Sequence, residues 1–230
     1  MKIIKFISCA LLAASLIVVL FCVSIIIPTF SVTYYMNQFR QFNIPEYMGI
    51  SESDIRIVTE NLQRYMDRRD PELDAEVRVH GIMRPFFNQR EILHMEDVRD
   101  LFDAGFRYLW ISCFVFVVMA ALIIKNKNYY SAAKHIAVGF GIILASFGIL
   151  TVVIALNFDE AFVIFHEIFF DNDLWLLDPR TDLLINLLPI EFFINISRTI
   201  ATLFIGSISF LFVLCTAITI KFRRRERIFI

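Results

Sequence analysis

The sequence is poor in the residues that interrupt helices, with 7 glycines and 6 prolines among 230 residues. Its four cysteines show no CxxC or Cys/His ligand spacing, and all lie in apolar blocks: Cys9, Cys22, Cys113 and Cys215. This placement favours small buried thiols in membrane helices and predicts no disulfide. The net charge is -1, so the overall charge does not indicate nucleic-acid binding.

Several catalytic signatures are also missing. The chain has no G-x-S-x-G elbow of a serine hydrolase, no P-loop and no glycine-rich nucleotide fingerprint. His166-Glu167 begins the H-E-x-x-H motif of a zincin, but Phe169-Phe170 replaces the second ligand. These absences argue against a serine hydrolase, a zincin and a nucleotide-binding site.

Long apolar blocks dominate what is present. The chain is 58% hydrophobic and contains 25 phenylalanines. Four blocks, at about residues 6–27, 108–124, 136–156 and 200–220, are each near the length of a membrane-spanning helix. Helices are expected because a backbone in lipid must satisfy its own hydrogen bonds. The first block is longer than a signal-peptide core and no A-x-A-like site follows it, so we expect an uncleaved anchor.

Lysine and arginine next to these blocks predict the orientation. They gather in three short segments: Lys2 and Lys5, then Lys125, Lys127 and Lys134, then Lys221, Arg223, Arg224, Arg225 and Arg227. All three lie on one side of a four-span arrangement, and the positive-inside rule makes that side cytoplasmic. The prediction is a single multi-pass domain of the cell membrane, residues 1–230. Both termini are then cytoplasmic, and segments of about 29–107 and 157–199 are extracytoplasmic.

The first outer segment has local structure. Ser51 and Asp54 resemble a capping box that starts a helix, and Val77 with Val79 gives a weak strand signal. Asn88 with Glu91 is a second capping signature, which predicts a helix from about Gln89 toward the second span.

The second outer segment is too polar to cross a membrane and too aromatic for an ordinary loop. Phe162, Phe165, Phe169 and Trp175 suit the headgroup boundary. Asn172-Asp173 is expected to end this aromatic helix, and residues 183–193 form another interfacial stretch interrupted at Pro189. The predicted fold class is thus an all-α membrane protein of four transmembrane helices with an extracytoplasmic, membrane-interfacial helical cap.

Two of the four histidines lie on amphipathic helices of the outer segments. His80 is expected in the weak strand, exposed, and His135 at the cytoplasmic edge of the third span. His94 and His166 are either packing residues or an acid/base pair. Asp97 could orient His94, and Asp159 or Asp173 could orient His166. A metal site of both histidines with Asp97 or Asp173 is possible, although no spacing selects it.

Two stretches carry a resemblance to a known family. NQREILHMEDVRDLF at 88–102 and FHEIFFDNDLWLLDPRTDLLINLLPIEFF at 165–193 resemble the two hallmarks of the lipoprotein intramolecular transacylases, the Lit family. The arrangement of four spans with both stretches outside also matches. One departure is Ile190, where a glutamate is expected after the proline, and Glu191 follows it directly.

The resemblance implies acyl transfer within a diacylated bacterial lipoprotein. The acyl chain of the glyceryl sn-2 ester moves to the α-amino group of the N-terminal cysteine, giving the lyso-form. The family's catalytic histidines correspond to His94 and His166, and the reaction requires no metal and no other cofactor. The second histidine, Asn172 or the Trp175 indole could bind the oxyanion, and the histidine roles stay open. Supporting or substrate-binding candidates are Asn88, Arg90, Glu91, Asp97, Asp159, Asn172, Asp173, Trp175 and Asp178.

The expected partners are the lipoprotein substrate and membrane lipid, not nucleic acid, and the sequence carries no signal of oligomeric state. Two other classes stay open. One is a non-enzymatic membrane scaffold that binds a partner, in which the histidines would only pack. The other is a metal-dependent membrane hydrolase.

Overall fold

A computed structural model describes the backbone of residues 2–228 and the side chains of residues 3–222. Its elements in chain order are α1 (Lys2–Thr29), α2 (Val32–Gln41), α3 (Ile44–Met48), α4 (Glu52–Met66), β1 (Glu76–Val79), β2 (Ile82–Pro85), α5 (Gln89–Lys125), α6 (Tyr129–Leu156), α7 (Phe158–Phe169), α8 (Leu183–Leu187) and α9 (Ile190–Ile228). The side chains of Lys2 and of the tail arginines 223–227, used above to predict orientation, lie outside the described residues.

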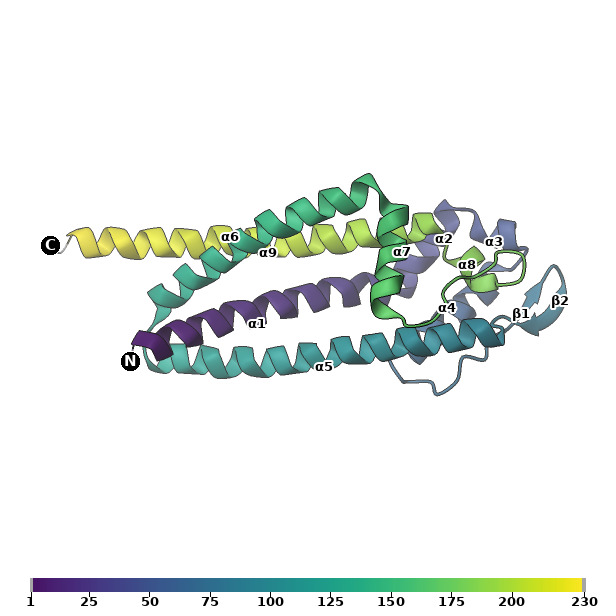
Figure 1. The fold of residues 1–230 in the computed structure, drawn as a ribbon, viewed down its shortest axis with the longest axis horizontal. Helices are drawn as coiled ribbons and strands as arrows, with labels where there is room; N and C mark the ends of the chain where they lie inside the picture. Colours follow the sequence, from purple (N-terminus) through teal and green to yellow (C-terminus); the bar gives the residue numbers. More distant parts are fainter. Residues whose placement is uncertain (1, 229–230) are drawn as a thin grey trace. The chain divides into compact units, whose positions relative to one another are not determined.

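The expectation of four long apolar helices is confirmed by α1, α5, α6 and α9 (Figure 1). All four are long and apolar enough to cross a membrane. Two begin well before the predicted spans, since α5 starts at Gln89 and α9 at Ile190. In α5 the added part, residues 89–107, holds eight charged residues. It is therefore a polar extension of an apolar helix and lies outside the apolar stretch that begins at Tyr108.

Contacts divide the chain into two compact units, and the first holds most of the apolar helix sequence. It consists of Met1–Ile25, Phe106–Leu156 and Ile200–Ile230. Its core buries Cys9, Phe140 and Ile208 completely. The outer faces are apolar as well: Trp110 is 72% exposed and Phe114 is 71% exposed. Large apolar side chains facing outward on every long helix fit a hydrocarbon surround.

The second unit consists of Ile26–Gly105 and Asn157–Thr199 and holds the shorter elements. The predicted cap of α4 is confirmed, because the Ser51 hydroxyl accepts a hydrogen bond from the Asp54 amide at 3.1 Å. The helix then buries Ile55, Val58 and Leu62 on one face, which are the positions expected from helical spacing.

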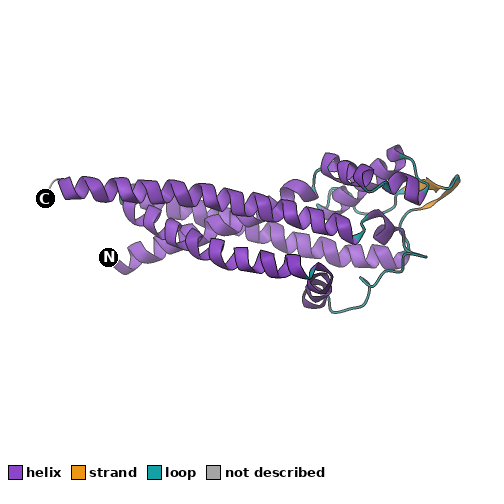
Figure 2. Ribbon diagram, turned by 90° about the horizontal axis from the view of Figure 1, so that it is seen from above, coloured by secondary structure: helices purple, strands orange, loops and turns teal. Residues whose placement is uncertain are grey.

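A small β-hairpin corrects the all-α expectation (Figure 2). β1 and β2 pair antiparallel, with Val77 opposite Arg84 and Val79 opposite Ile82. The weak strand signal at Val77 and Val79 is therefore confirmed. His80 is exposed as expected, but it lies in the turn after β1 and not in the strand, and its backbone amide donates to the Gly49 carbonyl at 3.0 Å.

Other local differences concern short elements. The helices α2 and α3 were not predicted, since helices of 10 and 5 residues gain most of their stability from packing rather than from local sequence. The aromatic helix α7 ends at Phe169, before Asn172-Asp173. The break expected at Pro189 is confirmed, because α8 ends at Leu187 and α9 begins at Ile190.

An aromatic cluster from α2 and α9 forms part of the core of the second unit. Phe39 is fully buried, and its ring stacks on Phe192 at 5.9 Å between centroids. Tyr35 contacts the same Phe192 ring at 4.7 Å. Beside them, the side-chain amide of Asn195 donates to the side-chain oxygen of Gln38 at 2.7 Å. These contacts join residues more than 150 positions apart.

We expect Phe39→Ala to lower the free energy of unfolding by about 3–5 kcal/mol, because it empties a fully buried aromatic site. Ile82→Ala, at a side chain that is 71% exposed, should change it by less than about 0.5 kcal/mol. Denaturant titration of the purified protein in detergent measures both. Equal effects of the two substitutions would contradict the assignment of the core.

Candidate active site

The first turn of α5 confirms the predicted capping box. The Asn88 side-chain oxygen accepts a hydrogen bond from the Glu91 amide at 3.0 Å. In return, the Glu91 carboxylate accepts one from the Asn88 amide at 2.7 Å. Such reciprocal bonds satisfy backbone donors that a helix start leaves free. They begin α5 at a defined residue, and His94 lies one turn later.

His94 and His166 lie together, as predicted. Their ring centroids are 6.1 Å apart, and both side chains come from the second unit. His94 is 8% exposed and His166 is 7% exposed. Phe170 contacts both rings, at 5.4 Å from His94 and 5.6 Å from His166. Two imidazoles buried side by side in an aromatic setting can exchange protons with a common substrate.

The ring of His166 has an assigned proton position. Its Nδ1 lies 2.7 Å from the Phe162 carbonyl oxygen, one turn earlier in α7. A carbonyl only accepts, so Nδ1 of the neutral ring carries the hydrogen and Nε2 carries the lone pair. Trp175 stacks on this ring at 4.7 Å, and Phe162 contacts it at 4.4 Å. Burial lowers the pKa of His166 below its usual 6.5.

His94 lacks the hydrogen bond at Nδ1 that His166 makes. Its Nδ1 is buried and has no hydrogen-bond partner among the described residues. Burial, followed by the nearby His166, lowers the pKa of His94 to about 4. The ring is therefore neutral at pH 7, with one nitrogen that donates and one that accepts.

These contacts correct the prediction that carboxylates orient the two histidine rings. The Asp97 carboxylate accepts from the Asn172 side-chain amide at 2.9 Å, while Nδ1 of His94 has no partner. The Phe162 carbonyl occupies Nδ1 of His166, so neither Asp159 nor Asp173 orients that ring through Nδ1. A carbonyl from the same helix therefore does what a carboxylate was predicted to do.

The supporting candidates join α5 to the chain after α7. Arg90 donates to the Asp173 backbone carbonyl, and Asn172 binds Asp97. Farther along, Asn88 donates to Asp182 at 2.7 Å. These contacts bring most of the predicted candidates together. Asp159 is the outlying candidate, in the first turn of α7, about 10 Å along the helix axis from His166.

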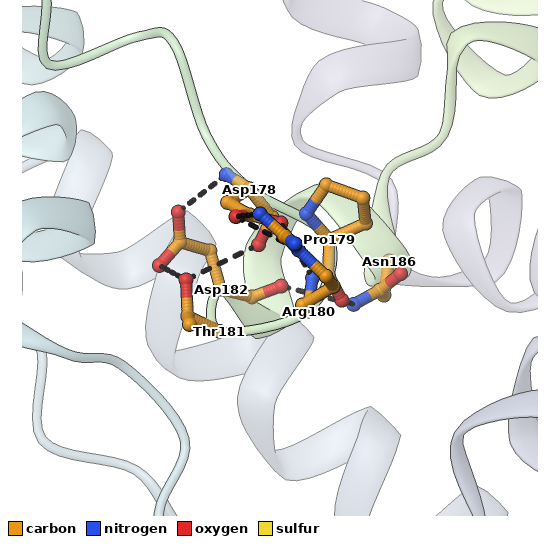
Figure 3. A network of polar contacts seen from close by, with 6 residues as sticks. All are labelled: Asp178, Pro179, Arg180, Thr181, Asp182 and Asn186. Atoms are coloured by element: carbon orange, nitrogen blue, oxygen red, sulfur yellow. Dashed lines mark hydrogen bonds and ion pairs between the residues drawn. The ribbon is translucent and has the colours of Figure 1, made fainter.

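Asp182 is a residue that the sequence interpretation missed. Its side chain is buried, and its carboxylate accepts from the Asp178 amide and the Thr181 hydroxyl (Figure 3). Asp178, a predicted candidate, pairs instead with the exposed Arg180, and this pairing lowers its pKa. An aspartate directly before the apolar run 183–185 is a helix-start signal, and it could have marked Asp182.

A hollow of ≈560 Å³ shares two aromatic residues with the surroundings of the histidines: Phe170 and Trp175 line it and also contact His166, whereas neither histidine lines it. Its lining is Glu167, Phe170, Asp171, Asn172, Asp173, Trp175 and Leu176. One wall is thus aromatic and the rim is acidic, which suits a ligand with an apolar part and a cationic end. Among residues 3–222, no three His, Cys, Asp or Glu side chains gather as metal ligands.

The sequence profile of the lipoprotein intramolecular transacylases matches residues 10–193, which include both histidines. The chain belongs to this family. It is therefore an acyltransferase, and the hypothesis of a non-enzymatic scaffold is set aside. An uncharacterized protein of Aquifex aeolicus strain VF5 is 24% identical over 185 residues, which is 80% of this chain and 79% of the relative.

Solved structures of this family share the fold. The membrane-integral lipoprotein intramolecular transacylase of Bacillus cereus superposes with a TM-score of 0.78 at 21% identity, over 99% of this transacylase and all of that chain. Two variants of the Bacillus cereus protein, with one histidine replaced by arginine or by alanine, superpose with TM-scores of 0.72 at 20% identity. The superpositions cover 95% of the arginine variant and 97% of the alanine variant. Membership of this family together with four helices long and apolar enough to cross a membrane makes the transacylase a membrane protein.

The buried His94 predicts a pH dependence of stability. Its folded pKa lies below its usual value, so the unfolded chain binds the proton first and stability falls as the pH drops from 6.5 toward 4. His94→Gln cannot titrate, so the wild type should lose about 2–3 kcal/mol more than the variant between pH 7.5 and 4.5. Unfolding in detergent at both pH values measures this difference. Parallel pH profiles would contradict it, because carboxylates common to both proteins cancel.

Proposed function

We propose that this transacylase moves the sn-2 acyl chain of a diacylated lipoprotein to the α-amino group of its N-terminal cysteine, with His94 and His166 as the catalytic residues. The observation that carries this proposal is the pair of buried, neutral imidazoles, 6.1 Å apart between ring centroids. Nucleophile and electrophile belong to one substrate molecule. Holding them together therefore supplies much of the rate, and no enzyme nucleophile is needed.

His166 is the general base in this proposal. The α-ammonium has a pKa near ~8, and its neutral form attacks. As the amine nitrogen bonds to the ester carbonyl carbon, it passes a proton to Nε2 of His166, which holds the free lone pair because Nδ1 donates to Phe162. The same proton then goes to the glyceryl oxygen as the carbon–oxygen bond breaks. The products are the N-acyl cysteine and a free sn-2 hydroxyl.

His94 stabilises the tetrahedral intermediate in this proposal. A neutral imidazole carries one N–H, and a donor aimed at the developing oxyanion stabilises the transition state. Its Nδ1 is buried and has no partner among the described residues, so it is a polar atom that a substrate group entering beside the ring would satisfy. Asn172 already donates to Asp97. We therefore assign the oxyanion to His94, with the Trp175 indole as the alternative donor.

The substrate fits the hollow beside the rings. Its acidic rim attracts the α-ammonium before the proton is lost, and its aromatic wall accepts the methylene groups next to the ester. The lipoprotein is anchored in a bilayer, so we infer that membrane lipid surrounds the same site. A metal-dependent hydrolase is less well supported, because the described residues provide no three-ligand group.

The inferred topology is that of one membrane domain, residues 1–230, with spans at about 6–27, 108–124, 136–156 and 200–220. Residues 29–107 and 157–199 form an extracytoplasmic, interfacial cap, and both termini are cytoplasmic. Lysines next to the spans, from Lys5 to Lys221, support this orientation.

Replacing either histidine tests the chemistry. We expect His94→Ala and His166→Ala each to lower lyso-lipoprotein formation by at least about 100-fold, the scale of a lost acid/base or oxyanion group. Mass spectrometry of the N-terminal peptide of a reporter lipoprotein measures the product, and the amount of each variant in the membrane is the control. Unchanged N-acylation in one variant would remove that histidine from the mechanism.

A tagged carboxyl terminus tests the topology. A fluorescent protein fused after Ile230 should fold and fluoresce, whereas alkaline phosphatase fused there should stay inactive, because a cytoplasmic terminus favours the first and prevents the second. The reverse pair of results would place the tail outside and overturn the proposed orientation.

A further inference from the structure

The capping box of α5 makes a second set of hydrogen bonds. Within the box, Asn88 uses its side-chain oxygen and Glu91 uses one carboxylate oxygen to start the helix. Each side chain then has one polar atom left. The Asn88 side-chain nitrogen donates to Asp182 at 2.7 Å, and the second Glu91 oxygen accepts from the Leu184 amide at 2.5 Å. The two residues that begin α5 therefore also hold a segment more than 90 positions later.

Burial makes these bonds necessary. Glu91 is fully buried and Asp182 is 4% exposed. A buried carboxylate is strongly unfavourable unless hydrogen-bond donors surround it. The donors here are backbone amides, the Thr181 hydroxyl and the Asn88 side chain between the two acids. If one bond is lost, a buried charge is left incompletely satisfied, so residues 182–184 are held firmly against α5.

The held residues, 182–184, end the stretch of chain whose earlier part covers the histidines. Phe170 and Trp175 contact the imidazoles, and their segment runs from the end of α7 to Asp182. His94 lies three residues after Glu91 on the same helix. A displacement of residues 182–184 along α5 would therefore change the position of one histidine relative to the walls around the other.

We propose that Asn88, Glu91 and Asp182 are positioning residues: they form a hydrogen-bonded clip that fixes residues 170–184 against α5 and so sets the distance between His94 and His166. The clip touches no reacting atom and acts through the histidines. It rests on the proposed function of that pair.

The start of α4 shows that a helix can be capped without a hydrogen bond to another segment. There the Ser51 hydroxyl caps the Asp54 amide, and its other contact is with Ser53 in the same helix. A serine is thus sufficient to start a helix in this unit. An asparagine at residue 88 adds a donor that points away from its own helix, toward Asp182, and this donor separates the clip from the cap.

Asn88→Ser is therefore the discriminating variant, because serine keeps the cap and loses the bond to Asp182. We expect kcat for lyso-lipoprotein formation to fall at least about tenfold with KM changed less than about threefold, because misplaced catalytic groups slow the chemical step. The matched control, Ser51→Ala, removes a cap that touches only its own helix, and it should leave both constants near wild type. Equal activity of Asn88→Ser and wild type would overturn the clip.

Exchanging the side chains of Asn88 and Asp182 tests whether activity lost in a single variant can be rescued. Asn88→Asp should lower kcat further, because two carboxylates then face each other. Adding Asp182→Asn restores one donor and one acceptor in reversed order, so the double variant should recover to within about threefold of wild type. If Asn88→Asp is not recovered from membranes, return of protein and activity in the double variant still supports the clip. No improvement over Asn88→Asp would overturn it.

The histidine variants distinguish this proposal from the one it rests on. If His94→Ala retains activity, the histidine mechanism fails whatever the result at Asn88. If both histidine variants are inactive while Asn88→Ser remains fully active, the clip alone fails.

Discussion

The meeting of the two histidines depends on hydrogen bonds between the first turns of α5 and residues 172–184. Asp97 binds Asn172 and Arg90 binds the Asp173 carbonyl, one on each side of His94 along the helix. The capping box binds the far end of the same segment. These contacts place Trp175 and Phe170 against the imidazoles. Because the segment has only one short helix of its own, side-chain bonds to α5 determine where it lies.

The electrostatic state of the pair follows from its burial. Both imidazoles lose solvent, which disfavours the charged form, and the nearby His166 lowers the pKa of His94 further. The pair of neutral rings therefore accepts one additional proton more easily than two. The Phe162 carbonyl, which accepts from Nδ1, partly offsets this effect of burial at His166. A base that is neutral at rest can accept a proton from an amine and readily return it to an alkoxide.

Much of the fold was predictable from local sequence. Spans of about 20 apolar residues need helices in any membrane, and the helix starts at Ser51 and Asn88 carry their own capping residues. The short helices α2 and α3 and the end of α7 were not predictable in this way. Their stability comes from packing, as at Phe39 and Phe192, and such contacts join parts of the chain that no local pattern relates.

The sequence by itself determined the four long apolar helices, the family, and the two histidines as candidates, because hydrophobic length and motif residues are written in consecutive positions. Only the tertiary structure decided that a backbone carbonyl binds the ring of His166 and that no carboxylate binds Nδ1 of His94. Asp97, expected to orient His94, binds Asn172, and the Phe162 carbonyl orients His166. Asp182 entered the site without having been predicted. The bonds of Asp97 and Asp182 join residues 75 and 94 positions apart, and even the Phe162 carbonyl, four residues before His166, competes with carboxylates that spacing alone does not rank.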